Sequence, residues 1–244
     1  MVQTAGATFN NTALSTVNAA TCTQANGADA TAAGLCASAS GTGATALGSN
    51  AQAASTNTTA VGFRSVATFA GSVAIGYQAQ ATADPTTAIG ANSLASGNNA
   101  VALGAGASAV ADNSVALGAN SVATRANTVS VGTAGNERQI TNVAAGVMPT
   151  DAVNMSQLNA VQTQVNSVAR KAYAGIAGAT ALAMIPEPDA GKSFSIGLGT
   201  AGYQGSQAVA VGIAARISAN IKFKAGAGIS GSGTTVGMGV AYQW

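Results

Sequence analysis

A glycine recurs every 14 residues through the middle of this chain. The seven positions are Gly48, Gly62, Gly76, Gly90, Gly104, Gly118 and Gly132. The residue before each glycine is Val, Ile or Leu, and the residue three positions before it is Thr or Val. A period this short is typical of stacked coils, because one coil cannot bury its own apolar residues and must share them with its neighbours. The sequence therefore predicts a parallel β-solenoid over this segment.

Each predicted strand carries a small residue between its two larger ones. This residue is Ala in six coils and Ser130 in the last. Because side chains alternate along a strand, the two larger residues share one face and the alanine points the opposite way. We expect the alanines to face outward and to pack against a symmetry-related copy. The glycine permits the positive φ that closes each coil. A low-complexity linker and a Thr-array ice-binding solenoid are the alternatives, although the register is kept throughout and an outward Thr column is missing.

The composition excludes several classes of function. Charged residues make up only 7% of the chain and histidine is absent, whereas about a quarter of an average protein is charged. Without histidine there is no Ser-His-Asp or Cys-His catalysis and no His-based metal site. The carboxylates lack the spacing of known metal motifs, and the nine basic residues are scattered. We therefore expect no enzyme, no catalytic residue, no metal, no cofactor and no nucleic-acid partner.

The last part of the chain alternates small and large apolar residues in four segments of about 10–12 residues, the length of a tilted membrane strand. The large residues expected to face the membrane are Phe194, Ile196, Leu198, Val209, Val211, Ile213, Ile221, Phe223, Val236, Met238, Val240, Tyr242 and Trp244. Four strands cannot close a barrel, and open edges are not tolerated in lipid. Three chains of four strands would close, so we expect a homotrimer with a 12-stranded transmembrane β-barrel. A soluble β-meander is the alternative.

A helical segment precedes these strands. Pro149-Thr150-Asp151 is a helix-start signal, with Thr150 or Asp151 as the N-cap. A heptad seam then follows at Leu158, Val161, Val165 and Val168, which predicts a short trimeric coiled coil; an amphipathic core helix is the alternative. Residues 170–185 are small and nearly uncharged, so we expect them to fill the barrel lumen.

The two cysteines are also one period apart. Gly34 lies one period before Gly48, so the solenoid is expected to begin earlier, with degenerate coils. In that frame Cys22 and Cys36 occupy one column on adjacent coils, about 4.8 Å apart, which falls within the disulfide window of about 4.4–6.8 Å. We predict an intrachain disulfide that staples the N-terminal end. A pair of unrelated cysteines is the alternative.

Three parts of the chain together resemble one family. The motif Ser72-Val73-Ala74-Ile75-Gly76, followed by Ala79 and Ala81, resembles the head repeat of the YadA-like trimeric autotransporter adhesins. Residues 137–158 (ERQITNVAAGVMPTDAVNMSQL) resemble the family's neck, and residues 170–244 resemble its membrane anchor. The resemblance implies a mainly β protein with a left-handed parallel β-roll head, three rolls side by side. It also implies that the outer-membrane assembly machinery reads the terminal Trp244.

The resemblance and the patterns divide the chain into six expected regions. They are degenerate head coils (1–42), β-roll repeats (43–136), a neck (137–154), a coiled-coil stalk (155–171), a lumen helix with its linker (172–190) and the four-stranded anchor (191–244). An exported chain needs a signal peptide, and residues 1–4 do not resemble one. We therefore expect that the signal has been removed.

The resemblance also implies the function. Such a protein exports itself to the bacterial outer membrane, exposes its head on the cell surface and serves virulence. It attaches bacteria to collagen, fibronectin, laminin or host cells, or to one another in autoaggregation and biofilm. The turn after each repeat glycine is expected to be exposed, and it holds Phe63-Arg64 and Tyr77-Gln78 on neighbouring coils, a candidate ligand contact. These rings could instead cover neighbouring coils or the trimer seam. An outer-membrane pore or a purely structural display scaffold are the alternative functions.

Overall fold

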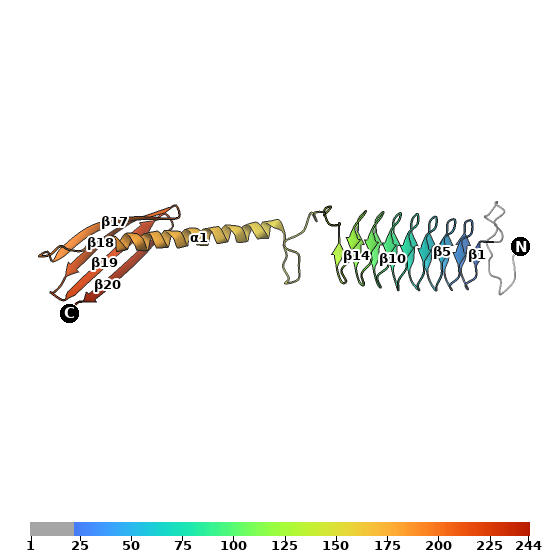
Figure 1. The fold of residues 1–244 in the computed structure, drawn as a ribbon, viewed down its shortest axis with the longest axis horizontal. Coiled ribbons are helices and arrows are strands. Elements are labelled where there is room, and N and C mark those ends of the chain that lie inside the picture. Colours follow the sequence, from blue (N-terminus) through green and yellow to red (C-terminus); the bar gives the residue numbers. More distant parts are fainter. Residues whose placement is uncertain (1–21) are drawn as a thin grey trace. The chain divides into compact units, whose positions relative to one another are not determined.

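The computed structural model describes residues 22–244. The expectation of degenerate head coils over residues 1–21 lies outside the described residues. The chain divides into two compact units, residues 1–140 and residues 141–244 (Figure 1). Within the described residues, no helix is both long and apolar enough to cross a membrane.

The first unit is a solenoid of two parallel sheets. The even sheet consists of β2 (Thr31–Ala33), β4 (Thr45–Leu47), β6 (Thr59–Val61), β8 (Val73–Ile75), β10 (Thr87–Ile89), β12 (Val101–Leu103), β14 (Val115–Leu117) and β16 (Val129–Ser130). The odd sheet consists of β1 (Gln24–Ala25), β3 (Ser38–Ala39), β5 (Gln52–Ala53), β7 (Val66–Ala67), β9 (Gln80–Ala81), β11 (Leu94–Ala95), β13 (Ser108–Ala109) and β15 (Val122–Ala123). Figure 1 shows the coils stacked in chain order.

The strands pair one period apart. Val73 pairs with Thr87, and Ala74 pairs with Ala88, on β8 and β10. The same register holds along the even sheet, so equivalent residues of successive coils form columns. The 14-residue sequence period is therefore the length of one coil, as predicted.

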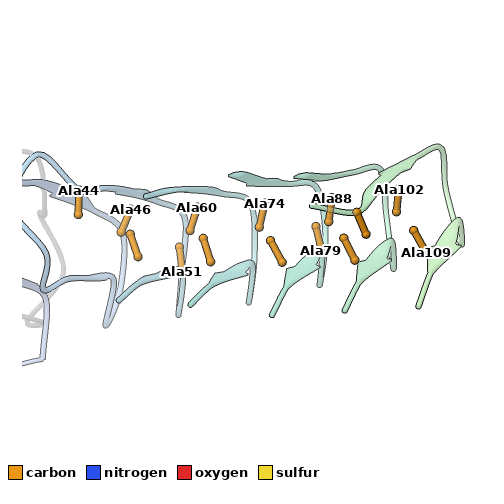
Figure 2. Close-up of a cluster of buried hydrophobic side chains, with 14 of the residues drawn as sticks. Ala44, Ala46, Ala51, Ala60, Ala74, Ala79, Ala88, Ala102 and Ala109 are labelled. Carbon is orange, nitrogen blue, oxygen red and sulfur yellow. The ribbon is translucent and has the colours of Figure 1, made fainter. Parts of the chain in front are cut away.

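The core of this solenoid is made of alanine, which corrects the predicted orientation. Ala46, Ala60, Ala74 and Ala88 of the even sheet are fully buried, and so are alanines of the odd sheet such as Ala81. Figure 2 shows the methyl groups of labelled alanines such as Ala60, Ala74 and Ala109 pointing into the space between the two sheets. Strands of two or three residues joined by tight turns leave a thin space, which alanines fill on the strands and buried Ser and Thr fill beside them, as at Ser72 and Thr58. The alanine column therefore lies inside and the larger residues lie outside.

The solenoid begins earlier than its best repeats. β1 starts at Gln24, and it pairs with β3 in the same register as the later coils. Cys22 and Cys36 are joined by a disulfide at the N-terminal end, with their Cα atoms 4.4 Å apart.

The second unit contains one long helix, α1 (Met155–Ala183). It runs without a break through the expected stalk (155–171) and into the expected lumen segment. The predicted N-cap was wrong, because Asn154 caps the helix and forms a capping box with Gln157. Asp151 instead closes the preceding turn, where it accepts hydrogen bonds from the N–H groups of Val147 and Met148 at 3.0 and 2.9 Å.

Four antiparallel strands complete the unit in sequential order: β17 (Phe194–Tyr203), β18 (Ser206–Arg216), β19 (Ile221–Ser230) and β20 (Gly233–Tyr242). α1 packs on one face of this sheet through Ala174, Ala177, Gly178 and Ala181 (Figure 1). Glycines on that face allow close approach, and a Cβ on Gly228 would lie 2.9 Å from the carbonyl oxygen of Gly178. The small residues of these strands therefore make room for the helix.

Candidate functional site

The outer face of the even sheet is an exposed apolar strip. The large residues that precede the repeat glycines point outward, and four of them are 37% to 44% exposed: Leu47, Ile75, Leu103 and Leu117. The outer face of the odd sheet is more polar, with Ser38, Gln52, Gln80 and Ser108 on it. Contiguous apolar surface of this kind marks a protein interaction site. The apolar strip, and not the alanine column, is thus the face that suits a neighbouring roll.

The helix has two opposite apolar faces. The predicted seam residues Leu158, Val161, Val165 and Val168 are all more than half exposed. At about 100° per residue, this seam continues through Ile176 on the side about 160° from the alanines that pack on the sheet. The single chain therefore leaves the seam open along the whole of α1.

The sheet of the second unit also has an uncovered apolar face. The residues predicted to face the membrane lie on one side of the paired strands, for example Leu198 beside Val211 and Phe223 beside Val240. That side is opposite the face that holds α1. β17 and β20 are edge strands, each with ten residues and only one partner. An exposed edge of this length needs a further strand.

Basic residues of β19 hold the end of the helix. The Lys224 ammonium donates to the carbonyl oxygens of Ala183 and Ile185 at 3.3 and 2.8 Å. A positive charge at this place is favourable because it lies near the C-terminus of the helix. Lys222 pairs with Glu187 of the linker at 3.0 Å. This hydrogen bond is the main reason that the pKa of Glu187 lies below its ordinary value. The linker is thus tied to the sheet.

The predicted contact residues come together at one edge of the solenoid. The rings of Phe63 and Tyr77 stack with centroids 5.7 Å apart and planes 12° apart, and the guanidinium of Arg64 lies 5.2 Å from the centroid of Phe63. The two rings are 40% and 50% exposed. We call Phe63, Arg64, Tyr77 and Gln78 the aromatic cluster.

The aromatic cluster keeps the backbone of the repeat but places unusual residue types on it. Arg64 and Gln78 have φ of 55° and 53°, a region that Asn and Gly tolerate and long side chains rarely adopt. Other coils place Asn50, Asn92 or Gly106 at this position. Residues that are held in an unfavourable conformation are a reason to look for function.

The sequence analysis missed one residue at the end of the solenoid. Arg138 donates to the hydroxyl of Ser121 at 2.9 Å and to the carbonyl oxygens of Val131 and Ala119 at 2.7 and 2.6 Å. These groups lack a following coil, so Arg138 caps the stack. Its position just past the last repeat was the available signal. In the part of the chain that the structure describes, no group of His, Cys, Asp or Glu could hold a metal ion.

Three family models match the chain in order. The YadA head domain repeat matches in overlapping copies at residues 39–65, 53–79, 70–93, 81–107 and 109–134. The coiled stalk of trimeric autotransporter adhesin matches residues 139–181. The YadA-like membrane anchor domain matches residues 186–244.

Two solved structures are similar to parts of the chain. The collagen-binding domain of the Yersinia adhesin YadA is 35% identical, with 57% of this chain and 85% of that chain covered and a TM-score of 0.48. The membrane anchor domain of the trimeric autotransporter YadA, solved by solid-state NMR, is 20% identical, with 43% of this chain and 97% of that chain covered and a TM-score of 0.35.

Proposed function

The chain belongs to the YadA-like trimeric autotransporter adhesins, and we propose that it attaches bacteria to host extracellular-matrix proteins or host cells through the edge of its roll. The match to the anchor model assigns residues 186–244 to the outer membrane. The match to the head model assigns the roll to the cell surface.

A homotrimer accounts for the three surfaces that one chain leaves open. The apolar strip of each even sheet would be covered by a neighbouring roll, and the seam of α1 by the helices of the other two chains. The edges β17 and β20 would pair between chains, which closes a 12-stranded barrel with its large apolar residues toward outer-membrane lipid. The assembly machinery would then read Trp244. In this arrangement the three helices occupy the lumen, which argues against an open pore.

The aromatic cluster carries the adhesive proposal. Exposed Tyr and Arg dominate binding hot spots, and in this cluster Arg64 and Gln78 take positions that hold Asn or Gly in other coils. Three copies on each trimer and many trimers on each cell would multiply a weak contact. The cluster is therefore the proposed contact with matrix ligands.

The test replaces residues of the aromatic cluster with substitutions that leave the solenoid folded. Bacteria that display Phe63→Ala, Arg64→Asn and Tyr77→Ala together should lose attachment to surfaces coated with collagen, fibronectin or laminin. Asn is chosen at residue 64 because it tolerates the positive φ. Phe69→Ala is the matched control, since Phe69 is similarly exposed in another turn of the same coil. Unchanged attachment by the triple variant, with its trimer intact on an unheated gel, would end the proposal.

A further inference from the structure

The aromatic cluster belongs to a column of residues that runs along one edge of the roll. The residue after each repeat glycine is Ser49, Phe63, Tyr77, Ala91, Ala105 or Ala119 in successive coils. Backbone hydrogen bonds keep these positions in line: the Gln78 N–H donates to the carbonyl oxygen of Phe63 at 2.8 Å, and the Asn92 N–H to that of Tyr77 at 2.7 Å. Side chains of this column are thus stacked coil upon coil.

The stack of rings ends at Tyr77. One face of its ring is covered by Phe63, at a centroid distance of 5.7 Å. The opposite face is turned toward the next coil, where the column offers only the methyl group of Ala91. Half of Tyr77 is exposed. The roll therefore presents a flat aromatic face, and the place beside it above Ala91, here called the step, holds no larger side chain of the column.

Polar side chains with free hydrogen-bonding capacity directly follow the residues of this column in the sequence. Among the hydrogen bonds of residues 22–244, none involves the side chains of Arg64, Gln78 or Asn92 or the phenol of Tyr77. An amide group both donates and accepts. The step thus combines an aromatic platform with mixed donors and acceptors.

The aromatic platform and the free amides together favour a sugar ring over a proline ring as the ligand. A proline ring could also stack on Tyr77, but it carries only C–H groups around its rim and has no N–H, so the amides of Gln78 and Asn92 would stay without partners beside it. A sugar ring presents C–H groups on its flat face and hydroxyl groups around its rim. The C–H face suits the ring of Tyr77, and hydroxyl groups suit the free amides of Gln78 and Asn92 because each can donate and accept.

We propose that the free face of Tyr77, the step above Ala91 and the side chains of Gln78 and Asn92 form a subsite for an uncharged sugar ring of a host glycan. The inference rests on the proposed adhesive function and gives it a ligand class. Each site alone binds weakly, and the three sites of a trimer together bind a branched or repeating glycan more tightly.

The experiment uses the detergent-extracted trimer of the full chain with chitotriose and lacto-N-neotetraose as probes, followed by saturation-transfer NMR. The unaltered trimer should receive the strongest transfer on the C–H face of one sugar ring. Tyr77→Ala should weaken binding about tenfold, the order of a lost aromatic stacking contact. Tyr77→Phe should keep most of the affinity because the ring remains.

A second variant fills the step without removing any existing group. Ala91→Tyr should extend the stack, leave the trimer stable and abolish transfer to the sugars. Ala119→Tyr is the matched control, because it makes the same change in the same column two coils further on and should bind like the unaltered trimer. Equal sugar binding by the Ala91→Tyr and Ala119→Tyr trimers would overturn the inference.

The outcomes separate this inference from the adhesive function itself. If the trimer ignores both oligosaccharides but binds a (Pro-Pro-Gly)10 peptide through Tyr77, the sugar subsite is wrong and the adhesive cluster stands. If cells that carry the triple variant still attach, the adhesive cluster is wrong whatever the sugars do.

Discussion

The alanine core makes the roll sensitive to the addition of two methyl groups. Ala74 is fully buried, and its neighbours in the even sheet are Ala60 and Ala88, one coil away on either side. Ala74→Val adds volume where the two sheets face each other through alanine methyls alone. Overpacking of a core costs about 1–3 kcal/mol, and a homotrimer contains the change three times.

The consequence can be measured by trypsin cleavage after Arg64, which lies in the same coil as residue 74. The protease needs the coil to open, so at low protease concentration its rate follows the open population. A loss of about 1–3 kcal/mol per chain raises that population by about 5- to 150-fold. Mass spectrometry of the detergent-extracted protein gives the cleavage rate.

The control adds the same two methyl groups at the surface. Ala105→Val lies in an exposed turn, where substitutions are usually within about 0.5 kcal/mol, so its cleavage rate should change about twofold at most. If Ala74→Val resists trypsin as well as Ala105→Val does, the alanines do not form the core and the orientation described above is wrong.

Three further predictions test other parts of the chain. Gly199→Ala places a Cβ against the carbonyl oxygen of Ala181, so the helix cannot stay on the sheet. An unheated gel should therefore show loss of the trimer, and a trimer at normal yield would contradict this packing. Arg138→Ala removes three hydrogen bonds and should speed amide exchange in the last coils but not in the first ones. An equal change in exchange rate along the whole roll would refute the capping role. Hydrogen bonds from Met148 and Val147 lower the pKa of Asp151 from its ordinary 3.8, so the turn keeps this stabilisation above pH 3.8 and loses it as the pH falls further. Amide exchange at Met148 should therefore rise below pH 3.8. Asp151→Asn should remove this pH dependence.

The period of the roll could be predicted from the sequence, but which face of each strand points into the core could not. Alternation shows that Val73 and Ile75 share a face and that Ala74 takes the other, without saying which face is internal. Large residues normally fill cores, so Ala74 was expected outside. The deciding quantity is the thickness of the coil. A coil of 14 residues encloses a thin space that Ala, Ser and Thr side chains fill, and the larger apolar residues are left for a neighbouring chain.

The N-cap residue of α1 could not be predicted from the local sequence either. Thr150, Asp151 and Asn154 are all residues that cap helices, and Pro149 made the first two the better candidates. The choice depends on Gln157, whose side chain bonds both the N–H and the carbonyl oxygen of Gly146 at 2.9 and 3.0 Å. That contact spans 11 residues and fixes the cap at Asn154, which local spacing does not reveal.

The central claim is that three chains share one membrane anchor. The most direct test is the mass of the detergent-extracted protein by light scattering, beside an unheated gel. The account predicts a heat-resistant particle of three times the 23.2 kDa chain mass. A monomer of one chain mass would contradict it, because the outer edges of β17 and β20 would then stay unpaired and the seam of α1 would have no partner helices.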